Sequence, residues 1–192
     1  AADDMVQVNN FLMDVLKASD PFNTGSEISL SQAVDEAATR VGAQLGDRPD
    51  LASKVRFALG YSMISRNKLD TAERELGLAL RESRQAFGDE APATLRVREG
   101  IAQLRKEQGR LDEARGLLED IVASIEARGL QEDPMYFVAL NNLGDILVLQ
   151  EDYAGADALF RKAQALPPPA DPAQAAPSDQ AVLLVNRGLA AD

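Results

Sequence analysis

The feature that most constrains this chain is a pattern that recurs every 42 residues. Gly60, Ala102 and Gly144 are spaced by this period. Three further sets share it, namely Leu69, Leu111 and Tyr153, then Ala72, Ala114 and Ala156, then Leu76, Leu118 and Phe160. A fixed period of this length is typical of stacked repeats, in which each unit buries its apolar face against a neighbour. The period therefore predicts a binding scaffold, although it does not name what is bound.

Each period divides into two helices joined by a short polar turn. First helices are expected at about 51–66, 92–108 and 134–150, and Asp133-Pro134 is a strong start signal for the last of them. Second helices are expected at about 69–87, 111–128 and 153–166. Gly88 and Gly129 should end the first two of these, because glycine adopts a positive φ at little cost. The sequence thus predicts an all-α chain of antiparallel helix pairs.

The same register extends beyond the three clear repeats. Leu30, Val34 and Ala37 lie 42 residues before an equivalent apolar stripe, which predicts helices at about 5–19 and 29–45. An apolar stretch resumes at Ala181 after a segment rich in Pro and Ala, which predicts the first helix of a further, truncated repeat. The expected organisation is an N-terminal degenerate repeat or cap at 1–48, repeats at 49–90, 91–132 and 133–168, a loop at 169–178 and the truncated repeat at 179–192.

Composition argues against several classes of function. The chain has no histidine and no cysteine, so it lacks the commonest general base, the commonest transition-metal ligand and any thiolate. Adjacent acids such as Asp112 and Glu113 diverge on a helix and do not form a metal site. A net charge of -11 repels nucleic acid and anionic lipid, and favours a basic or neutral partner. We therefore expect no catalytic residue, no metal and no cofactor in this chain.

The membrane is also not expected to contact this region. The longest apolar runs, such as 135–140 and 181–185, are far shorter than the roughly 20 residues that cross a bilayer. The first residues do not resemble a signal peptide, and the chain reads as a piece of a longer protein.

The repeat residues resemble the tetratricopeptide repeat. Leu59-Gly60 with Ala72, Leu76 and Ala79, and the equivalent sets one and two periods later, carry this resemblance. The period exceeds the usual length of about 34 residues. Together with the run from Ala139 to Gly144, it is similar to the kinesin-light-chain-type subclass. The resemblance implies a right-handed superhelical array of helix pairs that binds a protein or peptide ligand.

A second, narrower resemblance concerns the beginning of the chain. The segments 11–21, 29–37 and 48–51 look like the opening of the repeat region that follows the transmembrane helix in many bacterial membrane serine/threonine protein kinases. This resemblance implies a periplasmic or extracytoplasmic sensor region in signal transduction, with the kinase and its membrane anchor elsewhere in the parent protein. The chain itself has no histidine for the catalytic loop typical of kinases and no glycine-rich phosphate loop.

In tetratricopeptide arrays the first helices line a concave groove, and the resemblance transfers its positions to this chain by register. They are Lys54, Phe57 and Tyr61, then Arg96, Glu99, Gln103 and Lys106, then Val138, Asn141, Asn142 and Asp145. Phe57 and Tyr61 are the sharpest candidates, because rigid aromatic side chains anchor partners well; alternatively, they pack against the adjoining repeat. The two asparagines either bind the backbone of a peptide or tie neighbouring helices together.

Two functions thus follow from the sequence. The first is a non-catalytic sensor or interaction region of a bacterial membrane kinase, outside the cytoplasm. The alternative is a cytoplasmic adaptor, either free-standing or joined to a transcriptional regulator. An apolar span of about 20 residues shortly upstream of the chain would favour the first.

Overall fold

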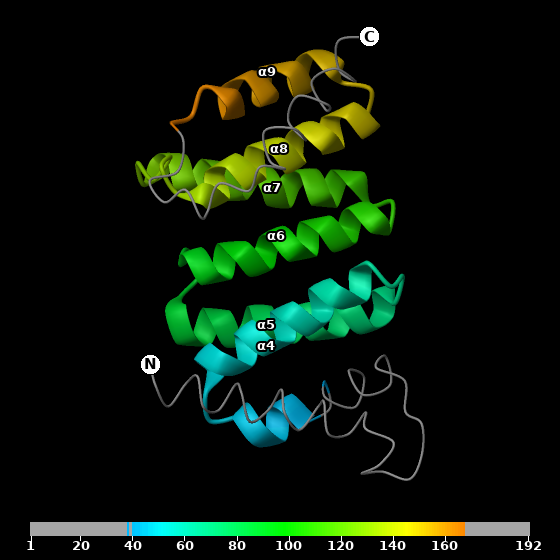
Figure 1. Ribbon diagram of the computed structural model, residues 1–192, viewed down its shortest axis with the longest axis vertical. Helices are drawn as coiled ribbons and strands as arrows, with labels where there is room; N and C mark the ends of the chain where they lie inside the picture. The colour runs from blue at the N-terminus through cyan, green and yellow to red at the C-terminus, as the bar shows by residue number, and fades with distance from the viewer. Residues whose placement is uncertain (1–37, 39, 168–192) are drawn as a thin grey trace. The chain divides into compact units, whose positions relative to one another are not determined.

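The computed structural model describes residue 38 and residues 40–167, and within them every regular element is an α-helix. Six helices follow a short helical stretch at 40–45: α4 (Pro49–Ile64), α5 (Leu69–Phe87), α6 (Pro92–Glu107), α7 (Leu111–Ala127), α8 (Pro134–Leu149) and α9 (Tyr153–Gln164) (Figure 1). The predicted all-α class is confirmed, and the helix bounds lie within two residues of those predicted.

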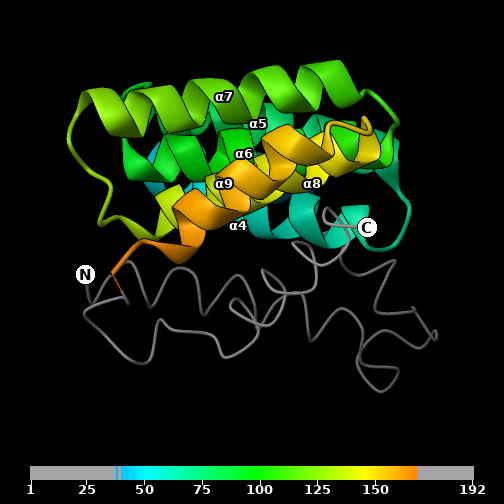
Figure 2. The same cartoon turned by 90° about the horizontal axis from the view of Figure 1, so that it is seen from above.

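The chain divides into two compact units between Val97 and Arg98, within α6, and each unit is described by itself. In the first unit, α4 packs along α5. In the second unit, α8 contacts both α7 and α9 (Figure 2). The predicted helices at 5–19 and 179–192, most of the one at 29–45 and the loop at 169–178 lie outside the described residues.

The turn inside each helix pair has the same backbone conformation. Lys68 N–H donates to the Met63 carbonyl at 3.0 Å, and the bonds from Arg110 to Arg105 and from Asp152 to Leu147 are the equivalents one and two periods later. The residue before each of these donors has a positive φ, namely Asn67 at 57°, Gly109 at 73° and Glu151 at 64°. This is the Schellman ending, which satisfies the last carbonyls of a helix and reverses the chain.

Glu151 is the least suitable of the three residues for that conformation. A side chain with a Cβ costs about 1–2 kcal/mol in the left-handed region, whereas glycine pays roughly 0.5–1 kcal/mol in conformational entropy. We therefore expect Glu151→Gly to raise the free energy of unfolding by about 0.5–1 kcal/mol in urea titrations. Glu132→Gly is the control, because Glu132 has a negative φ; an equal gain there would contradict the explanation.

The helix starts follow the capping residues. The Asp133 carboxylate accepts the Met135 N–H at 2.9 Å, and Pro134 occupies the first helical position, as the sequence predicts. Helix α4 begins at Pro49, earlier than expected, because this proline also takes the first helical position.

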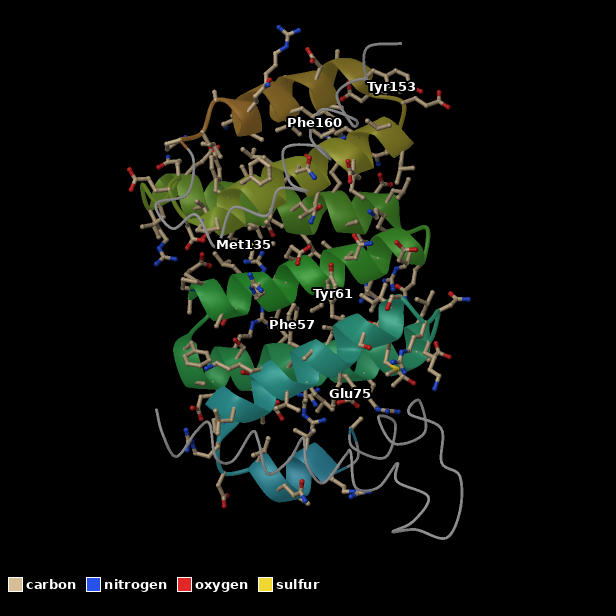
Figure 3. All side chains as sticks on the ribbon, viewed as in Figure 1. Phe57, Tyr61, Glu75, Met135, Tyr153 and Phe160 are labelled. Atoms are coloured by element: carbon tan, nitrogen blue, oxygen red, sulfur yellow. The ribbon has the colours of Figure 1, made fainter. Side chains whose placement is uncertain are left out.

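The interior is the apolar stripe that defines the repeat. Ala72, Leu76 and Ala79 on α5 are fully buried, and so are their counterparts on α7 and α9. The small residue on the first helix admits the large one on the second. A Cβ built on Gly60 would lie 2.8 Å from Leu76 Cγ, and one on Gly144 would lie 2.7 Å from Phe160 Cζ. Figure 3 shows Phe160 directed between α8 and α9.

The helical stretch at 40–45 belongs to the same core as α4. Val41 and Leu45 are buried with Ala52 and Val55, and Leu59 packs against this cluster. The predicted stripe residues Leu30, Val34 and Ala37 lie outside the described residues, whereas Val41 and Leu45, near the end of the predicted helix at 29–45, are buried.

Candidate functional site

The aromatic part of the predicted groove lies on one face of α4. The Phe57 and Tyr61 rings are 5.6 Å apart between centroids and tilted by 39° (Figure 3). Tyr61 is 43% exposed, Phe57 is partly exposed and Lys54 is exposed. Arg96, the next predicted groove residue, is exposed on α6. These four side chains remain accessible, so their predicted role as partner contacts stands as a prediction.

Glu99 and Asn142, both predicted groove residues, are bonded to each other. Asn142 Nδ2 donates to Glu99 Oε1 at 2.8 Å, and this bond joins α8 to α6. Glu99 is only 7% exposed. Its carboxylate is held inside the fold, which favours a structural role, and a contact with a partner stays an untested prediction. For Asn142, the geometry favours the second of the two interpretations, in which it ties neighbouring helices together.

Val138, Asn141 and Asp145 follow one another along a single face of α8, at helical spacings of three and four residues. All three are partly buried. The Asn141 side-chain oxygen, Oδ1, is shielded from solvent and has no hydrogen-bond partner among the residues that the structure describes. Burial raises the pKa of the Asp145 carboxyl, and Lys106 on α6 offsets only part of this effect. This face of α8 therefore combines a shielded amide oxygen with a carboxylate whose charged form is disfavoured by burial.

A shallow depression lies beside this face, between α6, α7 and α8. It is lined by Ala102, Gln103, Lys106, Leu118, Asn142 and Ile146. Gln103 Nε2 donates to Glu107 Oε1 at 2.9 Å, so its amide is held along α6. The structure thus brings together Gln103, Lys106 and Asn142, which the sequence placed in one groove by register alone.

A buried charge cluster in the first unit was not predicted. Arg56 on α4 donates to Glu75 at 2.7 Å and to Glu82 at 2.9 Å, both on α5. The Arg56 and Glu75 side chains are 8% and 2% exposed. A signal was present in the register, because Arg56 aligns with the buried Leu140 two periods later. Charge at a position that is apolar in another repeat indicates a buried ion pair.

A second network links three helices of the second unit. Glu126 Oε1 on α7 accepts the Tyr136 hydroxyl at 2.6 Å and the Lys162 ammonium at 2.5 Å. The Lys162 ammonium also lies 5.7 Å from the centroid of the Tyr136 ring. The hydrogen bonds from Lys162 and Tyr136 lower the pKa of Glu126, and the bond to Glu126 raises the pKa of Lys162. This network ties α7, α8 and α9 together.

The lowered pKa of Glu126 predicts an acid-sensitive contribution to stability. The unfolded carboxyl titrates near 4.5, so the contribution is fully present above that pH and is lost as the pH falls through the lower folded pKa. We expect Glu126→Gln to flatten the decline in melting temperature below about pH 4.5. Glu132→Gln, at an exposed position before α8, is the control. If the melting temperature of Glu126→Gln declined with acid as steeply as that of the unmodified chain, Glu126 would not be the source of the acid sensitivity.

Two further observations bear on function. Among the residues that the structure describes, no helix is both long enough and apolar enough to cross a membrane. Within the same residues, no group of three or more carboxylates is placed to hold a metal ion.

Comparison with known proteins agrees with this architecture. Residues 138–165, which cover most of α8 and α9, match the tetratricopeptide repeat family model. A search of curated proteins found no significant match. The chain thus contains a tetratricopeptide repeat, and such repeats indicate a protein–protein interaction domain of a typically non-catalytic fold.

Solved structures extend the similarity over most of the chain. BtubC (BKLC) from P. vanneervenii is similar with a TM-score of 0.69 and 18% identity, over 97% of this chain and 82% of that one. A putative kinesin light chain with tetratricopeptide-like repeats from Podosopora anserina is similar with a TM-score of 0.57 and 16% identity, over 82% of this chain and 79% of that one. These similarities establish a kinesin-light-chain-like repeat fold.

Proposed function

We propose that this chain is a non-catalytic sensor or interaction region that binds a peptide or protein along the first helices of its repeats. The observation that carries the proposal is the accessible aromatic pair of Phe57 and Tyr61 on a first helix of this repeat fold. Rigid aromatic side chains bury a large area at low entropic cost, which makes them frequent anchors in interfaces. In the finer proposal, the parent protein is a bacterial membrane serine/threonine protein kinase and this region lies outside the cytoplasm.

The binding role is tested by pull-down from a lysate of the source cells. Tyr61→Ala and Gln103→Ala should each reduce recovery of the partner several-fold relative to the unmodified chain. Tyr153→Ala is the matched control, because Tyr153 is 46% exposed but lies on the second helix α9, away from the predicted groove positions. Equal recovery of the partner with all three variants would show that Tyr61 and Gln103 do not belong to the binding surface.

The sensor role is supported by the resemblance of segments 11–21, 29–37 and 48–51 to kinase repeat regions. It is tested on the full-length parent protein, with alkaline phosphatase fused after Asp192. Phosphatase activity in intact cells, together with an apolar span upstream, is the expected result. An inactive fusion with a DNA-binding domain upstream would instead support the cytoplasmic adaptor.

A further inference from the structure

The inference concerns how the chain holds the aromatic pair of α4 in place, and it rests on the proposed binding function. Phe57 directly follows Arg56, so the two side chains point about 100° apart around the helix. Arg56 is buried, whereas Phe57 and Tyr61 are at least partly exposed. We propose that the buried charge cluster of Arg56, Glu75 and Glu82 fixes the rotation of α4 and so keeps its aromatic pair on the accessible face.

The bonds of the cluster are directional. Arg56 Nε donates to Glu82 at 2.9 Å, and Nη1 donates to Glu75 at 2.7 Å. The two glutamates are seven residues apart on α5, about 10 Å along its axis, so they hold the planar guanidinium from two directions. A Cβ built on Gly42 would lie 3.3 Å from Arg56 Nη2, so the preceding helical stretch covers the same group. Rotation of α4 by one residue would break the bonds to both glutamates.

The apolar pattern of α4 does not by itself define which face is buried. Val55, Phe57, Ala58 and Leu59 flank Arg56 in one nearly continuous apolar run, and side chains in such a run point in every direction around a helix. Val55 is buried, whereas Ala58 is exposed. Hydrophobic burial alone therefore distinguishes the rotations of α4 weakly, and the charge cluster supplies the missing preference. Buried polar networks have this effect when each member has its partners.

The third repeat builds the same place without charge. The residues two periods after the cluster are all leucines, namely Leu140, Leu159 and Leu166. Leu140 is fully buried and the other two are partly buried. In that repeat the aromatic positions differ as well, because Asn141 and Asp145 stand where the first repeat has Phe57 and Tyr61. The fold thus accommodates leucine at all three cluster positions, and the charged form accompanies the aromatic pair.

Fluorine NMR of the 192-residue chain tests the positioning directly, because it needs no partner. The chain has three tyrosines, so labelling with 3-fluorotyrosine gives three resonances, and Tyr61→Phe identifies the one from Tyr61. The test variant combines Arg56→Leu, Glu75→Leu and Glu82→Leu. We expect the Tyr61 line to be narrow in the unmodified chain and broadened or split in the triple variant, because α4 then samples more than one rotation.

Controls separate this effect from a general loss of structure. Tyr136 and Tyr153 lie in the second unit, and their lines should stay unchanged. Arg74→Ala removes an exposed partner of Glu75 but leaves the bonds of Arg56 in place, so the Tyr61 line should stay narrow. Glu82→Leu alone removes one of the two anchors of Arg56, at a side chain that is 20% exposed, and should also broaden the Tyr61 line. This single variant decides the question if the triple variant does not fold.

The pull-down connects the positioning to binding. With a melting temperature close to that of the unmodified chain, the triple variant should retain several-fold less partner. A narrow Tyr61 line in Glu82→Leu and in the folded triple variant, or broadening of all three tyrosine lines, would overturn the inference. Equal recovery of the partner despite a broadened Tyr61 line would also overturn it and leave the binding function intact. If the unmodified chain retains no partner, the proposed function fails, and the fluorine line alone decides whether the cluster fixes α4.

Discussion

Arg56→Ala is expected to lower the free energy of unfolding by about 3–5 kcal/mol, because it removes the buried cation that pairs with two glutamates of the first unit. Glu75 is 2% exposed, and its carboxylate loses a charge-assisted bond of 2.7 Å. Glu82 loses a bond of 2.9 Å. Urea unfolding followed by circular dichroism measures the change, since the midpoint shifts while the slope stays constant.

Two companion variants test whether burial causes the effect. Arg74 pairs with the same Glu75, but its side chain is 58% exposed, so Arg74→Ala should cost no more than about 1 kcal/mol. The triple variant Arg56→Leu, Glu75→Leu, Glu82→Leu replaces the whole cluster by apolar side chains, and leucine is the residue that aligns with Arg56 in the third repeat. Because apolar replacement of a whole buried charge cluster is often neutral or stabilising, it should recover most of the loss. A triple variant as unstable as Arg56→Ala would contradict this account.

Gly144→Ala is expected to lower the free energy of unfolding by about 1–3 kcal/mol through overpacking. The added Cβ would lie 2.7 Å from Phe160 Cζ, and the ring is fully buried, so it cannot move aside without disturbing α8 and α9. Gly116→Ala on α7 is the matched control, because no atom of the described residues lies within 4 Å of its Cβ position. There the expected effect is a gain of about 0.5–1 kcal/mol from helix propensity.

The second repeat supplies a rescue for Gly144→Ala. Ala102 and Leu118 occupy the positions that Gly144 and Phe160 occupy one period later, and both are buried. The double variant Gly144→Ala, Phe160→Leu therefore recreates a pair that this fold already accommodates. We expect it to be more stable than Gly144→Ala alone. Strictly additive losses in thermal unfolding would show that the two residues are not coupled.

The helix pairs could be predicted from the sequence because the same 42-residue period appears in the buried apolar residues and in the residues that begin and end helices. The apolar stripe fixes which face of each helix is buried, and Pro134 and Gly129 fix where helices begin and end. The crossing position on the first helix is small in every repeat, as Gly60, Ala102 and Gly144 show, whereas the facing residue is leucine in two repeats and phenylalanine in the third.

The candidate site was less predictable, because polar side chains choose partners that the register does not specify. Glu99 has the helical position of a groove residue, yet its carboxylate accepts the Asn142 amide and is buried. The register places Arg56 at a buried position, but its partners Glu75 and Glu82 are identified only by the structure. Accessible side chains such as Tyr61 make few contacts that would fix a role, so their function depends on the partner.

The recurrence of one turn conformation has a consequence for how this chain can change in length. The junctions at Asn67, Gly109 and Glu151 share the same backbone hydrogen bonds, so a segment of 42 residues excised between two successive junctions rejoins through an equivalent turn. Loss or duplication of a whole repeat thus leaves a turn of the same conformation where the chain is rejoined. The number of repeats, and with it the length of surface offered to a partner, can vary in descendants of this gene without any change in how one helix leads into the next.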